Sequence, residues 1–180
     1  MVIIGLGDTG VLVASRLVKQ FNVIGITTKP NLVSGQELGK RLTDLPWWRI
    51  HYNTPLKHFL GLSAVEIIQA KAEWVSPEQR SVRVRLPDGL DRVIDYDYLV
   101  IASGTSNGFW RDDSIRSQKE IDDALQADAA RIETASTIAV VGGGPCGVSC
   151  ALNIRRADPS KQVTLYFSGD RPLAGYHPTA

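Results

Sequence analysis

The sequence has few cysteines, no long apolar segment and almost no net charge. Two cysteines in 180 residues are too few for a disulfide framework. No run of about 18 apolar residues occurs, as a transmembrane helix would need, and the N-terminus lacks the pattern of a signal peptide. With 20 basic and 19 acidic residues, the charge of +1 gives no reason to expect nucleic acid as a partner. We therefore expect a reduced, cytoplasmic protein with no membrane span.

Two glycine-rich turns, 137 residues apart, are the most informative feature that is present. An apolar run at 1–4 predicts a strand, apolar residues from Val11 to Val18 recur at helical spacing, and 21–26 predicts a second strand. The same order returns with a strand at 137–141, a helix at 148–157 and a strand at 162–167. The turns themselves are Gly5-Leu6-Gly7-Asp8-Thr9-Gly10 and Gly142-Gly143-Gly144-Pro145-Cys146-Gly147. The sequence thus repeats a strand–turn–helix–strand unit.

The segment between the two units predicts a helix at 33–42, ending near Pro46, and then an inserted antiparallel sheet. Strands are expected at 65–68 and 72–75, and Val82, Val84 and Leu86 alternate with arginines as in a half-exposed strand. Pro87-Asp88-Gly89 is a turn by its chemistry, residues 92–94 return beside it, and 98–104 predicts a buried parallel strand. Ser117 and Glu120 fit a capping box at the start of a further helix.

These elements predict an α/β fold: a Rossmann-like parallel sheet with an inserted antiparallel β-meander, followed by a second, truncated Rossmann unit. We expect residues 1–112 to form the first dinucleotide-binding domain with its meander. Residues 113–180 are expected to form a connecting helix and the start of the second domain. An incomplete second sheet would keep an open edge, which favours association with another copy, so a homodimer is an expected arrangement.

A Gly-x-Gly-x-x-Gly turn between strand and helix binds a pyrophosphate: the glycines allow a tight turn and a close approach, and the helix N-terminus attracts the anion. The acidic residue expected about 20 residues later, which would bind ribose, is absent from both units. Thr27, Thr28 and Lys29 stand there in the first unit. The second unit has Phe167 and Ser168, with Arg171 nearby, which favours NADPH.

Three segments together resemble a known family: VIIGLGDTG, YDYLVIASG and TIAVVGGGPCGVSCA. The chain resembles the two-dinucleotide pyridine-nucleotide oxidoreductases that bind FAD and NAD(P)H, in the branch of apoptosis-inducing-factor-like proteins and type II NADH dehydrogenases. The resemblance covers essentially the whole chain. Because family members are roughly twice as long, it implies the N-terminal portion of such an enzyme.

The resemblance implies an FAD-dependent NAD(P)H oxidoreductase that passes electrons to a quinone-like or other small-molecule acceptor. It implies no specific catalytic residue and no metal. It places FAD at the first turn and NAD(P)H at the second. The residues implied for FAD are Gly5, Leu6, Gly7, Asp8, Thr9, Gly10, Thr27, Thr28, Lys29, Ala72, Ala102, Ser103 and Gly104, and those for NAD(P)H are Gly142, Gly144 and Gly147. No Cys-x4-Cys follows the first turn and no Cys-x-x-Cys precedes the second, so no redox disulfide is expected.

Several other interpretations stay open at this level. The first turn also resembles the NAD- or ATP-binding regulatory domains of ion transport, which have one glycine turn and no meander. A non-catalytic remnant that retains FAD binding is a third alternative. Cys146 and Cys150, four residues apart on a helix, are expected to pack rather than to pair, and Trp47 with Trp48 is expected to form a packed aromatic corner rather than a flavin shield. The three histidines, His51, His58 and His177, show no metal-ligand spacing.

Overall fold

The computed structural model describes residues 1–105 and 113–176. The chain forms two compact units, each described separately below. The first consists of Met1–Ser34 and Asn53–Glu120, and the second of Gly35–Tyr52 and Ile121–Ala180. The boundary expected at residue 112 separates two cofactor-binding domains rather than two compact units, and it stays a prediction.

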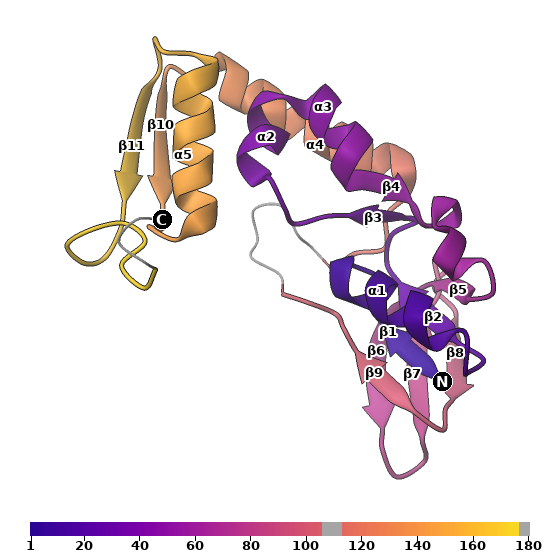
Figure 1. Cartoon of the computed structure of the whole chain (residues 1–180). Helices are drawn as coiled ribbons and strands as arrows, with labels where there is room; N and C mark the ends of the chain where they lie inside the picture. The colour runs from indigo at the N-terminus through magenta and orange to yellow at the C-terminus, as the bar shows by residue number, and fades with distance from the viewer. Residues whose placement is uncertain (106–112, 177–180) are drawn as a thin grey trace. The chain divides into compact units, whose positions relative to one another are not determined.

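The first unit is built on a four-stranded parallel sheet. Its strand order is β5 (Glu66–Gln69), β2 (Ile24–Thr27), β1 (Val2–Ile4) and β9 (Leu99–Ile101). Helix α1 (Asp8–Leu17) connects β1 to β2, which confirms the expected strand–turn–helix–strand unit (Figure 1). The strand expected at 98–104 is shorter and less buried than predicted. It forms the edge of the sheet, and Ile101 is 65% exposed.

Both faces of the central strand β1 are covered, which explains why Val2, Ile3 and Ile4 are all apolar and buried. Val2 and Ile4 point to one face, where they pack against Val82 and Val84 of the meander. Ile3 points to the other face and packs with α1 and with the segment that follows β4. The meander itself is the antiparallel sheet of β6 (Lys71–Ser76), β7 (Ser81–Arg85) and β8 (Asp91–Asp95).

A short antiparallel strand pair and two 3-10 turns complete the first unit. Strand β3 (Asn31–Val33) pairs antiparallel with β4 (Asn53–Pro55), and the 3-10 turns η1 (Leu56–His58) and η2 (Leu60–Leu62) follow. Leu56 and Leu62 are buried against the α1 face of the sheet. Strand β3 corrects one prediction, because the helix expected from residue 33 begins only at Leu38.

The second unit contains helices α2 (Leu38–Thr43) and α3 (Leu45–Tyr52), most of α4 (Gln118–Thr134), and a small parallel sheet. Pro46 does not end a helix as expected. It lies in the first turn of α3, where a proline leaves no hydrogen bond unmade. Strands β10 (Thr137–Val141) and β11 (Gln162–Tyr166) flank helix α5 (Pro145–Ala157), so the second strand–turn–helix–strand unit is present (Figure 1).

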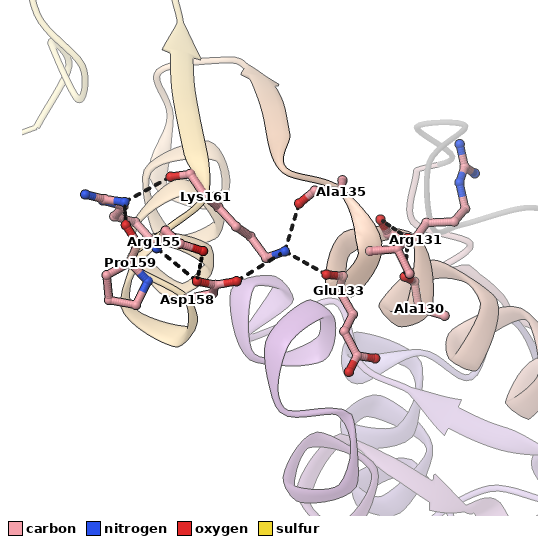
Figure 2. Close-up of polar contacts among 10 residues, drawn as sticks. Ala130, Arg131, Glu133, Ala135, Arg155, Asp158, Pro159 and Lys161 are labelled. Atoms are coloured by element: carbon pink, nitrogen blue, oxygen red, sulfur yellow. Dashed lines mark hydrogen bonds and ion pairs between the residues drawn. The ribbon is translucent and has the colours of Figure 1, made fainter.

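A buried lysine joins the end of α4 to the small parallel sheet. The ammonium of Lys161 donates to the carbonyls of Glu133 (2.7 Å) and Ala135 (2.8 Å), and lies 3.5 Å from the Asp158 carboxylate (Figure 2). Helix α4 begins with the expected capping box, in which the Glu120 carboxylate accepts from the backbone amide and the hydroxyl of Ser117. Side chains therefore form hydrogen bonds at both ends of α4, those of Ser117 and Glu120 at its start and that of Lys161 at its end.

Within residues 1–105 and 113–176, no helix has the length and apolar character needed to cross a membrane. The cytoplasmic location stays a prediction.

Candidate dinucleotide-binding sites

The three glycines of the first turn differ in how much space a side chain would have. Gly5 has a φ of +95°, and a Cβ on it would lie 2.4 Å from the carbonyl oxygen of Ala102. A Cβ on Gly10 would lie 1.8 Å from the carbonyl oxygen of Gly5, so α1 can pack this closely on the turn only with glycine. Around Gly7 the described residues leave open space within 4 Å of the Cβ position, its chain neighbours aside.

The turn leads directly into the N-terminus of α1. Gly7 is the N-cap residue, and no side chain of the described residues caps the helix there. The first amides of a helix lack partners within the helix, and the helix dipole adds a partial positive charge. The end of α1 at Gly7 therefore has the donors and the open space that a pyrophosphate needs.

A cavity of about 520 Å³ opens at this turn and gathers the residues expected at the first site. Of the residues expected to bind FAD, only Gly10 does not line this cavity, because it lies behind the turn against Gly5. The predicted residues that line the cavity are Gly5, Leu6, Gly7, Asp8, Thr9, Thr27, Thr28, Lys29, Ala72, Ala102, Ser103 and Gly104. Such a volume lies within the usual range of ligand sites. The role of these residues as cofactor contacts stays a prediction.

Two charged residues at this cavity were not predicted from the sequence. Lys71 and Asp113 both line it, and the Lys71 ammonium lies 2.7 Å from the Asp113 carboxylate. The hydrogen bond to Asp113 and the charge of that carboxylate raise the pKa of Lys71 above its usual value, so Lys71 is a cation at neutral pH. Lys71 precedes Ala72, which was a predicted contact, whereas Asp113 lies in a segment with no motif.

The second glycine turn repeats the geometry of the first. Gly142 has a φ of +120°, and a Cβ on Gly147 would lie 1.9 Å from the Gly142 carbonyl oxygen. Gly144 is the N-cap residue of α5, with open space around its Cβ position among the described residues. A cavity of about 650 Å³ lies here, lined by Gly142 and Gly144 but not by Gly147. Phe167, Ser168 and Arg171 also line it.

Comparison with known proteins gives the family. The sequence model of the pyridine nucleotide-disulphide oxidoreductases matches residues 1–180, the whole chain. The chain belongs to this family. The family name itself describes enzymes that oxidise or reduce with a pyridine nucleotide, and FAD and NAD(P)H, the cofactors expected from the sequence, are those of the family. A search of curated proteins found no match.

Solved structures share the fold of this family member at low sequence identity. NDH2 from Plasmodium falciparum in complex with RYL-552 matches with a TM-score of 0.76 and 18% identity, over 99% of this chain and 43% of that one. Reduced CoADR-RHD from Bacillus anthracis matches at 0.74 and 16%, over 98% and 34%. The sulfide:quinone oxidoreductase from Aquifex aeolicus matches at 0.61 and 22%, over 92% and 42%. The chain therefore spans less than half the length of these proteins.

The cysteines of this pyridine nucleotide-disulphide oxidoreductase are both free and both lie on α5. Cys150 is buried, as expected of a packing residue, and burial together with the neighbouring Cys146 raises its pKa to about 11. Its thiol therefore stays protonated at neutral pH and is a poor nucleophile. Cys146 is exposed in the first turn of α5, so the expectation that it packs is wrong.

The two neighbouring tryptophans, Trp47 and Trp48, differ in burial. Trp48 is fully buried, its indole donates to the Gln36 carbonyl, and Arg41 lies over its ring. Trp47 is 38% exposed and stacks on His51. Trp48 thus packs as the aromatic-corner interpretation expects. Among the described residues no group of His, Cys, Asp and Glu is placed to hold a metal ion, and His177 lies outside them.

Proposed function

We propose that the chain binds FAD at the Gly5–Gly10 turn and NAD(P)H at the Gly142–Gly147 turn. It would do so as part of an oxidoreductase that passes electrons from NAD(P)H to a quinone-like or other small-molecule acceptor. The observation that carries this proposal is the repeat of one three-glycine geometry in both units. The meander behind the first turn and the family membership support FAD at that turn.

The residues present fit a dinucleotide. Gly7 leaves open space where a pyrophosphate would approach, and α1 presents its first amides there. Ala72 would meet the adenine, and Ala102, Ser103 and Gly104 would close over the other side of the cavity. The flavin, when bound, would supply the ability to take up hydride and to release electrons. The chain's own residues would hold and orient it.

The lack of a cysteine pair at the first turn supports direct electron transfer from the flavin to the acceptor. The only cysteines, Cys146 and Cys150, lie on α5, and neither is among the residues that line the first-turn cavity. A dithiol beside the flavin is the device by which disulfide reductases relay electrons, so we propose direct transfer to the acceptor. Quinones, dyes, oxygen and protein carriers remain acceptor classes for test. The division at residue 112 and the homodimer are further parts of this proposal.

The pyridine nucleotide is proposed to be NADPH at least as readily as NADH. Strand β11 ends without a carboxylate, and the cavity beside the second turn is lined by Ser168 and Arg171. A carboxylate would bind the ribose hydroxyls of NADH and repel a 2′-phosphate, whereas an arginine would attract that phosphate.

Absorption spectroscopy tests the proposal directly. The purified chain, incubated with FAD and desalted, should keep a flavin spectrum. Gly7→Val should abolish this retention, because the side chain would enter the open space at the turn. Gly144→Val is the matched control: it should leave FAD retention unchanged and instead weaken binding of NADPH and NADH, followed by fluorescence.

Equal FAD retention by the parent and by Gly7→Val would contradict the proposal. A parent that binds NAD or ATP but no flavin would favour the regulatory-domain alternative. A parent that keeps FAD but binds no NAD(P)H would favour the non-catalytic remnant.

A further inference from the structure

The ribose end of the first-turn cavity lacks a carboxylate at its usual position. Strand β2 ends at Thr27, and Thr28 and Lys29 follow. The Thr27 hydroxyl is engaged within its own loop, since it accepts from the Lys29 amide (3.3 Å) and donates to the Lys29 carbonyl (3.2 Å). The Thr27 hydroxyl is therefore poorly placed to accept from a ribose hydroxyl, which leaves a carboxylate elsewhere at the cavity as the alternative acceptor.

A short segment from elsewhere in the first unit crosses the ends of β2 and β5. Residues Asp113 to Arg116, here called the strap, are held there by two hydrogen bonds at Arg116. The Arg116 amide donates to the Thr28 carbonyl (3.0 Å). The side-chain amide of Gln69, the last residue of β5, donates to the Arg116 carbonyl (2.8 Å) and to the Thr28 carbonyl (3.3 Å). The strap thus lies directly beside the position of the absent carboxylate.

The strap brings an acid to the cavity. The acidic residues that line the cavity are Asp8 and Asp113, and they lie in different parts of the cavity. Asp8 lies at the glycine turn, in the first turn of α1. Asp113 lies with Lys71 and Ala72, on the side expected to hold the adenosine. The ion pair with Lys71 joins the strap to β6, and the Asp113 side chain is largely exposed and so accessible to a ligand.

We propose that Asp113 replaces the absent carboxylate of β2 and accepts hydrogen bonds from the ribose hydroxyls of the bound adenosine. This inference rests on the proposed function, because it concerns the FAD cavity. A carboxylate has about four acceptor positions, so the bond to Lys71 is compatible with further donors. Lys71 acts as a positioning residue, and the negative charge at this place disfavours a nucleotide that carries a 2′-phosphate.

The test measures ribose discrimination rather than overall affinity. Binding of ADP, 2′-deoxy-ADP, 3′-deoxy-ADP and 2′-phospho-ADP to the full chain is followed by calorimetry. The parent should bind ADP roughly tenfold more tightly than at least one of the deoxy analogues, as for a hydrogen bond to a charged group. It should bind 2′-phospho-ADP more weakly than ADP. Asp113→Asn should bind ADP and both deoxy analogues within about twofold of one another and should gain affinity for 2′-phospho-ADP.

Two further variants separate a ribose contact from a structural role. Lys71→Gln keeps the carboxylate but loosens the strap, so it should weaken all the nucleotides while keeping some preference for ADP over its deoxy analogue. Asp97→Asn removes an exposed carboxylate that does not line the cavity, and it should change none of the constants. Far-ultraviolet circular dichroism checks that each variant is folded.

The outcomes are distinguishable. If Asp113→Asn keeps the parent's preference for the ribose hydroxyls, or if the parent prefers 2′-phospho-ADP to ADP, the assignment of Asp113 is wrong while FAD binding still stands. Equal affinity of the parent for ADP and for both deoxy analogues would also show that the assignment of Asp113 is wrong, without measurements on a variant. If the parent binds neither FAD nor ADP, both this inference and the proposed function are wrong.

Discussion

The first and third glycines of each turn are needed by the backbone conformation or the packing, whereas the second has open space around its Cβ position among the described residues. Gly10 leaves 1.8 Å between an added Cβ and the Gly5 carbonyl oxygen, a distance that only a shift of α1 could relieve. Gly7 has open space at the same position. One motif therefore contains two kinds of constraint, which the sequence pattern alone does not separate.

Gly10→Ala should accordingly destabilise the first unit even without cofactor, by about 2 kcal/mol or more, because overpacking of a close contact costs this much. Gly7→Ala is the matched control, and its free energy of unfolding should stay near that of the parent. Urea unfolding followed by circular dichroism, in the absence of FAD, measures both. Equal stability of Gly10→Ala and Gly7→Ala would contradict the close packing of α1 on the turn.

Among the elements, α4 shows how a helix end is fixed by a residue distant in sequence. Lys161 is buried directly before β11, and its ammonium donates to the carbonyls of Glu133, at the end of α4, and of Ala135, the residue after the helix (Figure 2). The Asp158 carboxylate beside it has a lowered pKa, first because the Ser160 hydroxyl donates to it, so it stays ionised at neutral pH. A cation at a helix C-terminus is favoured by the helix dipole.

Lys161→Met should keep the length of the side chain and remove the donors, leaving two carbonyls without these hydrogen bonds. We expect the second unit to lose about 2 kcal/mol, as when buried groups lose bonds to a charged donor. Hydrogen exchange of α4 and β11, read by mass spectrometry, should become faster. Lys19→Met, at an exposed lysine of the first unit, should leave this exchange unchanged. Unchanged exchange in Lys161→Met would mean that the lysine does not hold these elements together.

At the scale of the whole molecule, the sequence predicts structural features that depend on neighbouring residues. It does not predict features that depend on contacts between residues distant in the chain. Glycine turns, apolar strands and the Ser117–Glu120 capping box are local, and the fold class follows from them. The start of α2 is not predicted correctly, because Val33 is as compatible with a helix as with the strand β3, whose partner β4 lies about 20 residues further along the chain. Asp113 is not predicted from the sequence, because its position at the cavity depends on the contact between Gln69 and Arg116, which are distant in sequence.

The second unit offers much less support to a bound nucleotide than the first. The strands of its described residues are β10 and β11, with α5 beside them, and Val141 and Tyr166 remain 84% and 56% exposed. The first unit, by contrast, has four parallel strands covered on both faces. A two-stranded sheet with exposed apolar residues is marginally stable by itself and tends to associate.

A preparation of residues 1–180 alone should therefore retain FAD but turn over poorly. Hydride transfer needs the nicotinamide held about 3–3.5 Å from the flavin, and a small positional error costs a large factor in rate. A sheet of two strands is a weak support for that geometry. We expect NADPH-driven reduction of a dye by the FAD-loaded chain to stay near the rate of a blank with free FAD. Gly144→Val, which should impair nucleotide binding, should give the same rate as the parent. Steady turnover by the parent that Gly144→Val abolishes would show instead that the second unit holds the nicotinamide in place.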